Sequence, residues 1–371
     1  MSEKYTTLNI SDIHMSNKLP HAKVGEDGIT NRLRDQMKLW RHVIKSVEKY
    51  KVDAVFIQGD LFDKSLLDPI TLTHTVEAIV AIPTNVWVLG GNHGASSVTG
   101  GRYMVEAFGA MRKDNIHFFK TGQAFSPRDW LNFYPVSFCP TGEAEKRISE
   151  YQLKLPGETK VLLLHHSIVG CSHIGWTCDD GLDAAKVCEG FDQVISGHFH
   201  EHQQFGPKLN GMYLGAPMHH HFGDIGRPAG YWIMRYQEGL GCVKTKMIDP
   251  KLPKFHSLDY VDGDWRGPEK VERGDFVRIQ AEVTAGKWIK LKPRVMEMKA
   301  ELEKQDVHVK IHHKPVHVSE VRIRPKSGGK TVTMEDQVRA YAKHSASSTE
   351  GGVKKITKLG LEILEDARNA S

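Results

Sequence analysis

The sequence lacks the features of a disulfide-stabilised, zinc-ribbon or membrane-spanning protein. Its 371 residues include five cysteines, an odd number, and none of them forms a CxxC pair. We therefore expect reduced thiols rather than a disulfide framework. No stretch approaches ~18 uninterrupted apolar residues, so we expect no membrane span. The opening MSEKYTTLNISDIH has no charged segment followed by an apolar one. It predicts a core strand in a cytoplasmic protein that is not exported.

A strong excess of one charge is also absent, because the net charge is only +5. The basic excess lies in the last third, where residues 251–371 carry 24 Lys and Arg against 18 Asp and Glu. This bias mildly favours a polyanionic partner. Histidine, in contrast, is abundant, with 21 copies. Many of these histidines stand near acidic residues at the ends of apolar runs.

Apolar runs of strand type alternate with helical patterns through the first 250 residues. The strand-like runs are Tyr5–Ile10, Asp53–Gln58, Asn85–Leu89, Ile116–Phe119, Leu131–Val136, Val161–Leu164, Gln193–Ser196, Gly211–Leu214 and Tyr231–Tyr236. Periodicity predicts helices over Asn31–Tyr50, Pro69–Ala81 and Gly101–Lys113. Early alternation, followed by strands with fewer helices, predicts an α/β fold: a β-sandwich flanked by helices rather than an all-parallel sheet.

A segment with two prolines, Asp249–Phe255, is typical of a linker. After it, strand patterns at Phe276–Val283 and Val307–Ile311 enclose a helical pattern at Lys292–Lys304, which predicts a small α+β domain. A polar stretch then precedes an amphipathic helix at Val353–Arg368. We therefore expect a main domain over residues 1–250, a small basic domain over 251–340, and a flexible stretch with a C-terminal helix over 341–371.

Five strand patterns end abruptly in residues that commonly bind metals. These residues are Asp12, His14, Asp60, Asn92, His93, His165, His198 and His200. The carboxyl ends of strands in open α/β sheets gather at one edge, so the five ends can converge on one site. Any single fragment is a weak signal, since a buried histidine is more often a core residue than a ligand. Five such fragments in order predict a metal centre.

The residue types indicate which metals would bind. Two carboxylates, one amide oxygen and several imidazoles form a mixed oxygen and nitrogen set without thiolate. Such a set favours Mn²⁺, Fe or Zn²⁺ over Ca²⁺ and over a sulfur-ligated structural zinc. A carboxylate shared by two cations holds them about 3.5–4 Å apart, the separation used in two-metal phosphoryl chemistry. The pattern thus predicts two divalent ions acting on a phosphate ester.

The motifs DxH, GDxxD, GNH, a strand-terminal His and GHxH occur in this order. Together they resemble the calcineurin-like metallophosphoesterase superfamily. Within it, the chain is most similar to the SbcD-type double-strand-break repair nucleases and related phage recombination endonuclease subunits. That finer resemblance rests on GDLFD, SGHFH and YLGAPMHHHFGDIGRPAGYW, followed by a small basic domain. The motifs cover about the first 235 residues, and the last third matches in layout alone.

The resemblance implies a role for each matching residue. Asp12, His14 and His200 would bind one metal, and Asn92, His165 and His198 the other, with Asp60 bridging the two. The metal expected from the resemblance is Mn²⁺. His93 would contact the scissile phosphate or protonate the leaving oxygen, since imidazole donates protons near neutral pH. The alternative for His93 is a packing role beside the ligands.

Several positions leave choices open. The segment LLLHHS offers His165 and His166, and we favour His165 because it directly ends the apolar run. The family pattern usually continues as GNHD, whereas this chain has Gly94, so the carboxylate that would orient His93 is missing. Asp63 is expected to support a ligand or cap a helix. The run HHH at residues 219–221 is expected to form a surface loop, because neighbouring strand residues point to opposite faces and chelate together poorly.

The resemblance also implies partners. Related nucleases dimerise through helices that correspond to Leu66–Val80 and Tyr103–Met111, although apolar positions there also suit core packing. They act with an SbcC-type ATPase, for which Val353–Arg368 would be the docking helix; folding back on its own domain is the alternative. DNA contacts are expected from basic residues of the C-terminal domain: Lys287, Lys290, Lys292, Arg294, Arg322, Arg324 and Lys326.

Three functions compete at this point. The first is a DNA exo/endonuclease subunit acting in recombination and double-strand-break processing, in a bacterial cell or a phage-infected host. The second is a metallophosphoesterase of small phosphodiesters or phosphoproteins. The third is a non-catalytic scaffold, suggested only by Gly94 and opposed by the intact ligand set.

Overall fold

The computed structural model describes residues 2–97, 100–111, 113–153, 157–173, 175–316, 333–345 and 350–369. The chain divides into two compact units. Unit 1 comprises Met1–Gln280 with Arg294–His312, and unit 2 comprises Ala281–Pro293 with His313–Ser371. The division into a main domain over residues 1–250, a basic domain over 251–340 and a C-terminal segment over 341–371 stays a prediction. None of the helices described is a candidate for a membrane-spanning segment.

Unit 1 is built on two six-stranded sheets. In spatial order, the first contains β16 (Gly241–Ile248), β15 (Tyr231–Gln237), β1 (Lys4–Ile10), β2 (Ala54–Gln58), β3 (Asn85–Leu89) and β6 (Ile116–Phe118). The second contains β13 (Gln203–Phe205), β14 (Gly211–Tyr213), β12 (Gln193–Gly197), β9 (Thr159–His165), β8 (Leu131–Val136) and β7 (Phe125–Arg128). Strands β1, β2 and β3 run parallel, as do β8, β9 and β12.

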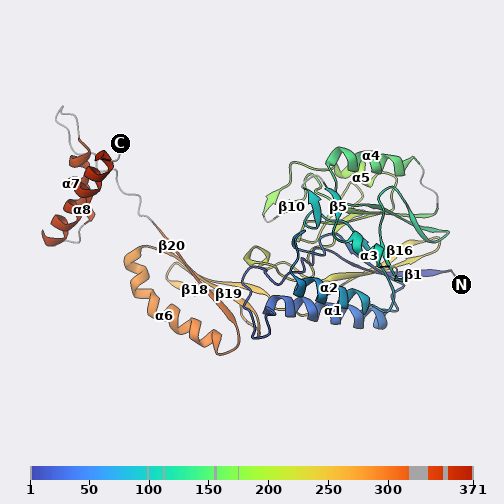
Figure 1. The fold of residues 1–371 in the computed structure, drawn as a ribbon, viewed down its shortest axis with the longest axis horizontal. Helices are drawn as coiled ribbons and strands as arrows, with labels where there is room; N and C mark the ends of the chain where they lie inside the picture. The colour runs from blue at the N-terminus through green and yellow to red at the C-terminus, as the bar shows by residue number, and fades with distance from the viewer. Residues whose placement is uncertain are drawn as a thin grey trace. The chain divides into compact units, whose positions relative to one another are not determined.

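The sheets face each other and helices cover their outer faces. The helices are α1 (Asn31–Tyr50), α2 (Pro69–Val80), α3 (Glu106–Ala110), α4 (Thr141–Gln152) and α5 (Ala184–Cys188). Figure 1 shows α1 and α2 on one side of the sheets and α4 and α5 on the other. This arrangement confirms the predicted α/β sandwich flanked by helices.

The central strands are apolar on both faces because each face meets a separate core. In β2, Ala54 and Phe56 pack into the core between the sheets, whereas Val55 and Ile57 pack against the helices on the outer face. In β9, Val161 and Leu163 face the same inter-sheet core, and the alternate residues face α4 and α5. Period-two alternation between two buried environments explains why these strands are continuous apolar runs.

Of two helices predicted from the sequence, the structure confirms one and contradicts most of the other. Helix α1 has its predicted bounds, Asn31–Tyr50, and the side chain of Thr30 caps its N-terminus by accepting a bond from the amide of Leu33. The predicted helix over Gly101–Lys113 is wrong for most of its length. Strand β5 (Gly100–Tyr103) pairs there with β4 (Ala95–Ser97), and only the short α3 is helical. Two consecutive glycines weaken a helix in this stretch.

The C-terminal elements begin with a four-stranded sheet in the order β18 (Asp264–Arg266), β17 (Phe255–Val261), β19 (Phe276–Val283) and β20 (His308–Pro315). Helix α6 (Ala285–Glu303) is longer than the predicted Lys292–Lys304 and carries Pro293 inside it. Two further helices follow, α7 (Met334–Ser345) and α8 (Glu350–Asn369), and they pack against each other. The sequence predicted α8 but not α7.

Candidate metal centre

The predicted ligands stand at the carboxyl ends of five strands, as parallel topology dictates. The order is Asp12 and His14 after β1, Asp60 after β2, Asn92 and His93 after β3, His165 at the end of β9, and His198 and His200 after β12. Three of these strands belong to one sheet and two to the other. The structure brings all eight side chains into neighbouring groups. The centre therefore lies where the two sheets meet.

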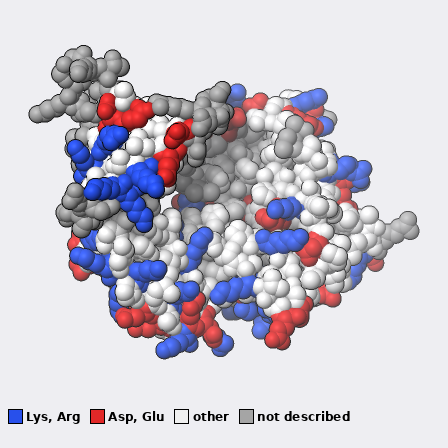
Figure 2. All heavy atoms as spheres, turned by 60° about the vertical axis from the view of Figure 1, so that its left-hand side comes forward, with Lys and Arg blue, Asp and Glu red and all other residues white. Residues whose placement is uncertain are grey.

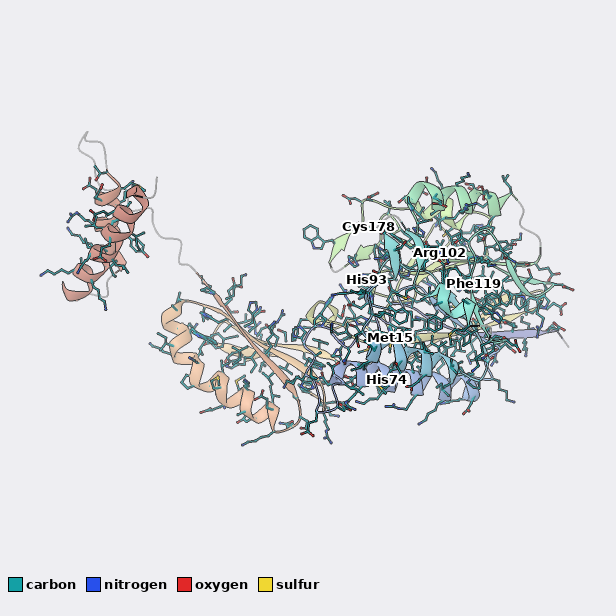
Figure 3. The ribbon with its side chains drawn as sticks, viewed as in Figure 1. Met15, His74, His93, Arg102, Phe119 and Cys178 are labelled. Carbon is teal, nitrogen blue, oxygen red and sulfur yellow. The ribbon has the colours of Figure 1, made fainter. Side chains whose placement is uncertain are left out.

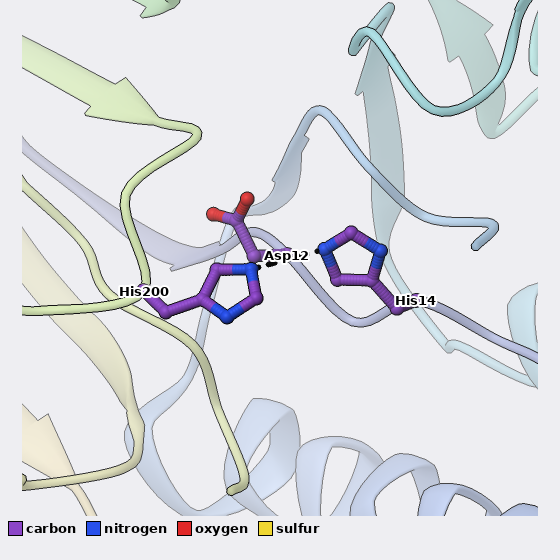
Figure 4. A group of neighbouring side chains, drawn as sticks. All are labelled: Asp12, His14 and His200. Atoms are coloured by element: carbon purple, nitrogen blue, oxygen red, sulfur yellow. Dashed lines mark hydrogen bonds between the residues drawn. The ribbon is translucent and has the colours of Figure 1, made fainter. Parts of the chain in front are cut away.

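One group contains Asp12, His14 and His200, whose ligand atoms lie within 4.8 Å of one another. The Nε2 atoms of His14 and His200 face each other at 3.1 Å, as Figure 4 shows. Burial lowers the pKa of His200 well below its usual value, and the nearby His14 lowers it further. A neutral His200 keeps a lone pair for a cation, which is the form a metal ligand requires.

A second group gathers around Asn92. Its Oδ1 atom lies 2.9 Å from Nδ1 of His198 and 3.1 Å from Nε2 of His165. Burial lowers the pKa of His198 to about 3, with His165 adding to the effect. The Nδ1 atom of His165 lies 2.9 Å from the carbonyl oxygen of Gln58, which only accepts hydrogen bonds. His165 therefore donates from Nδ1 and presents Nε2 to the centre.

Asp60 lies between the two groups. Its Oδ2 atom is 3.1 Å from Nε2 of His165 and 3.8 Å from Nε2 of His14. Its Oδ1 atom accepts a hydrogen bond of 2.9 Å from the amide of His93. Burial alone would raise the pKa of Asp60, but the imidazoles of His165 and His14 outweigh burial and lower it. An ionised carboxylate in this position is the arrangement expected of a bridge between two cations.

The carboxylates of the centre favour positive charge on two of its imidazoles. Burial would lower the pKa of His165, yet the carboxylates of Asp60 and Asp12 outweigh that effect and raise it to about 9. The pKa of His14 is likewise raised against burial, by Asp63, Asp60 and Asp12. Two buried carboxylates, an amide oxygen and imidazoles, without a thiolate, form a donor set that suits divalent transition metals. The residues present therefore fit two divalent cations.

The backbone at the centre adopts conformations that L-residues usually avoid. Asp12, His14, Asp60 and His198 have φ values of +53°, +50°, +43° and +98°. A left-handed conformation costs roughly 1–2 kcal/mol for a residue with a Cβ atom. Such strain persists where the surroundings determine the geometry, and it is concentrated at functional sites. Here the left-handed backbone turns the side chains at the strand ends toward one another.

Glycines allow the strand ends to approach closely. A Cβ atom on Gly59, which has a φ of +88°, would overlap the ring of His165. A Cβ atom on Gly91 would overlap the backbone and carboxylate of Asp60. The φ of Gly91 is not in the left-handed region, so this glycine is required by the close approach of the Asp60 segment rather than by a turn.

His93 is exposed beside His14 and Asp60, and Figure 3 marks its position. Its ring lies edge-on to that of His14, with centroids 4.5 Å apart. Its Nδ1 atom lies 2.8 Å from the carbonyl oxygen of Asp63. Since a carbonyl only accepts, Nδ1 carries the proton and Nε2 points elsewhere. The main chain of Asp63 therefore orients His93 in this chain, which has Gly94 in place of a carboxylate.

His165 and His166, the two histidines left open by the sequence, have different surroundings. His165 contacts Asp60 and Asn92, as described above. The Nε2 atom of His166 lies 3.2 Å from the carbonyl oxygen of Ser137, and its ring stacks on Phe138. Burial lowers the pKa of His166 to about 4. The structure thus groups His165, and not His166, with the other predicted ligands.

The three consecutive histidines do not form the expected surface loop, because His219 and His220 are buried. His219 lies against the carbonyl oxygen of Arg227 and accepts from the amide of Phe255. His220 reaches the carbonyl oxygen of Asp12 at 2.9 Å and packs beside the rings of His14 and His200. Sequence reasoning missed this supporting position, since only the fold brings residue 220 behind residue 12.

His221 belongs to a further group of possible ligands with His200 and Asp224. Its Nδ1 atom accepts a hydrogen bond from the amide of Gly223, and Asp224 accepts from the amides of His220 and His221. These bonds form a capping box around the short helix η1 (Phe222–Asp224). The capping box explains why the side chains of His221 and Asp224 lie close together without a metal.

Some of the basic residues that were predicted to contact DNA lie outside the described residues. Arg322, Arg324 and Lys326 are not described, whereas Lys287, Lys290, Lys292 and Arg294 lie on α6. Lys and Arg side chains are interspersed with Asp and Glu over the face drawn in Figure 2. DNA binding by the basic residues stays a prediction.

Comparison with known protein families identifies the family of this chain. Residues 5–202 match the family model described as calcineurin-like phosphoesterase. A dimetal phosphatase from Danio rerio is 12% identical over 66% of this chain and 98% of its own, with a TM-score of 0.39. The calcineurin-like phosphoesterase YfkN from Bacillus subtilis is 12% identical over 72% and 90%, with a TM-score of 0.34.

GAP50, the anchor in the inner membrane complex of Plasmodium, is 13% identical over 67% of this chain and 85% of its own, with a TM-score of 0.45. At these TM-scores the structural likenesses carry no argument about substrate. No curated protein matches the sequence.

Proposed function

Since this chain belongs to the calcineurin-like phosphoesterases, metal-dependent hydrolases of phosphoesters, we propose that it is a DNA exo/endonuclease subunit of the SbcD type. The observation that carries the two-metal chemistry is Asp60, placed between the two groups of donors. The DNA substrate is supported by the finer sequence resemblance in GDLFD, SGHFH and the segment that contains HHH. The basic excess of the last third adds to that support.

In this proposal, Asp12, His14 and His200 would hold one divalent ion, Asn92, His165 and His198 would hold the other, and Asp60 would contribute to both. When bound, the ions neutralise the phosphate and lower the pKa of a coordinated water. Manganese is the ion we propose, from the resemblance and the donor set. His93 is exposed beside the donors and donates from Nδ1 to Asp63, so its Nε2 is the atom available to the phosphate or the leaving oxygen.

Digestion of end-labelled linear DNA tests the proposal. The purified chain is assayed in Mn²⁺, in Mg²⁺ and in EDTA, with Asp60→Ala alongside. We expect cleavage in Mn²⁺ that EDTA and the substitution abolish. Hydrolysis of a small diester, bis(p-nitrophenyl) phosphate, is measured on the same samples. Activity on the diester without any on DNA, even after addition of an ATPase partner, would favour the alternative function, a phosphoesterase of small phosphodiesters.

We also propose that the chain forms a homodimer through the segment that contains α2. Most apolar residues of the two segments predicted to dimerise serve the chain's own core, since Val105 and Phe108 are buried and Leu67, Ile70 and Val76 pack against that core. Leu66 and Leu72 remain exposed and are the better candidates. Sedimentation of the Leu66→Glu/Leu72→Glu variant should show monomers where the wild type shows dimers; monomeric wild type would contradict this proposal.

For the second partner, an SbcC-type ATPase, we propose α8 as the docking helix. Leu359 and Ile363 are exposed on α8, while Gly360 lies against Val338 of α7. The helix therefore packs on α7 and still presents apolar side chains to solvent. Leu359→Asp with Ile363→Asp should abolish co-purification with the ATPase while leaving diester hydrolysis unchanged. Unaltered co-purification would rule out this face of α8.

A further inference from the structure

A two-stranded arm, residues 167–182, leaves the metal centre and returns to it. At its base, the amide of Leu182 donates to the carbonyl oxygen of Ser167 at 2.9 Å. Further out, the amide of Cys178 donates to the carbonyl oxygen of Cys171 at 2.8 Å. Beyond this pair, β10 (Ser172–His173) pairs with β11 (Trp176–Thr177). These bonds fix the path of the described part of the arm.

Side chains also fix the arm to the centre. The Oγ atom of Ser167, at the base, lies 3.1 Å from Nε2 of His198. Near the tip, the ring of His173 stacks on Phe199, with centroids 4.8 Å apart, and Phe199 in turn stacks on His198 at 5.2 Å. Gln203 exchanges two hydrogen bonds, of 2.6 and 2.7 Å, with the backbone of Ser172. A single ring, that of Phe199, therefore lies between His173 of the arm and the predicted metal ligand His198.

Trp176 stands opposite His173 in this ladder and is 80% exposed. Tryptophan gains free energy from burial of its large ring, so an indole that is 80% exposed gains little from its own fold. The backbone of Trp176 belongs to an arm that is anchored to the centre through Ser167 and His173. An exposed ring on such a backbone is suited to stacking on a flat apolar surface.

The charges around Trp176 narrow the choice of ligand. Asp179 and Asp180, also exposed on the arm, disfavour contact with a phosphate backbone. The π-face of a nucleobase carries no charge, and aromatic side chains stack on bases with little preference for sequence. A base is available for stacking only when it is unpaired, because a duplex already stacks its own bases. An unpaired base attached to the phosphate at the centre meets these conditions.

We propose that Trp176 stacks on an unpaired base of the DNA strand whose phosphate enters the metal centre. This inference rests on the proposed nuclease function and deepens it, because it gives the enzyme a preference for single-stranded or frayed ends. The arm holds the stacking surface, and the donors of the five strand ends would hold the ions that bind the phosphate. Recognition of the base and chemistry at the phosphate are therefore assigned to different residues.

The test measures DNA binding in Mn²⁺, with oligonucleotides whose phosphorothioate linkages resist hydrolysis, so that the centre is loaded and cleavage does not interfere. Fluorescence anisotropy is recorded for a labelled single-stranded oligonucleotide and for a blunt duplex, with wild type, Trp176→Ala and Trp176→Phe. Alanine should weaken binding of the single strand roughly 5- to 100-fold, since one stacked base contributes about that much. Phenylalanine should restore most of the affinity, and the duplex should be affected less than twofold.

Two controls separate this inference from the proposed function. Leu240→Ala removes an exposed apolar side chain outside the arm and should leave single-strand binding unchanged. Hydrolysis of bis(p-nitrophenyl) phosphate in Mn²⁺ should be equal in wild type and Trp176→Ala. If wild type cleaves DNA and Trp176→Ala binds single strands within twofold of it, the stacking role is wrong while the nuclease function stands. If wild type neither binds nor cleaves DNA, the proposed function fails and the stacking role fails with it.

Discussion

The proposed two-metal chemistry depends strongly on one side chain, that of Asp60. One carboxylate oxygen faces imidazoles from both groups of donors, and the other accepts the amide of His93. The residue is buried and has a left-handed backbone, so two unfavourable conditions are met at once. A fold retains such a residue where its neighbours hold it in place and its geometry is used.

At the residue scale, His93 can be separated from the ligands by substitution. His93→Asn removes the exposed imidazole but keeps the backbone amide that binds Asp60. We expect kcat on a phosphodiester to fall roughly 10²- to 10⁴-fold, the usual contribution of a positioned acid or base. The amount of bound metal, measured on the same sample, should not change. Activity within twofold of wild type would assign His93 a packing role instead.

The environment of Asp275, which is far from the centre in sequence, predicts that the free energy of unfolding depends on pH. Burial would raise its pKa, but bonds from His256 and from the amides of Lys254 and Glu272 outweigh burial and lower it. A carboxyl whose folded pKa is lowered stabilises the fold above its unfolded pKa, near 3.9. That stability is lost as the pH falls through the folded pKa.

We therefore expect Asp275→Asn to reduce the free energy of unfolding by about 1–3 kcal/mol at pH 7. The difference from wild type should shrink as the pH is lowered into and below the carboxyl range. Urea unfolding at a series of pH values measures both quantities. A difference that stays constant down to pH 3 would show that the charge of Asp275 is not responsible.

At the scale of elements, the centre depends on how closely the strand ends approach. Gly91→Ala places a Cβ atom against Asp60, so we expect a loss of metal binding and a fall in activity of at least tenfold. Gly142→Ala, in helix α4, is the matched control because a Cβ atom there meets nothing within 4 Å. It should be neutral or slightly stabilising, since alanine favours helix. Isothermal titration with Mn²⁺ compares the two, and unchanged binding by Gly91→Ala would contradict the close-approach argument.

The elements also show what the sequence can and cannot predict. Strand β2 and helix α1 were predictable because their patterns, a continuous apolar run and a capped amphipathic repeat, are local. The motifs placed ligand candidates at strand ends for the same reason. Helix α7 and the β4–β5 hairpin were missed, as was the burial of His219 and His220. The burial of His219 and His220 depends on contacts between residues distant in sequence, such as His220 with Asp12, which no local pattern encodes.

At the scale of the whole molecule, unit 1 unites two sheets at one metal centre. Strands β1, β2 and β3 contribute donors from one sheet, and β9 and β12 contribute donors from the other. Ions that bind only the folded form should therefore stabilise both sheets together. At 100 times its dissociation constant, one bound ion adds about 2.7 kcal/mol. We expect Mn²⁺ to raise the Tm of wild type in calorimetry, and Asp60→Ala to show little or no rise.

The metal content of the purified chain tests the central claim most directly. Wild type and Asp60→Ala are saturated with Mn²⁺, freed of loosely bound ions by gel filtration, and analysed by inductively coupled plasma mass spectrometry. The two groups of donors around Asp60 predict two ions per wild-type chain and fewer than two per Asp60→Ala chain. One ion or none in wild type, or two in both proteins, would contradict a two-metal centre bridged by Asp60.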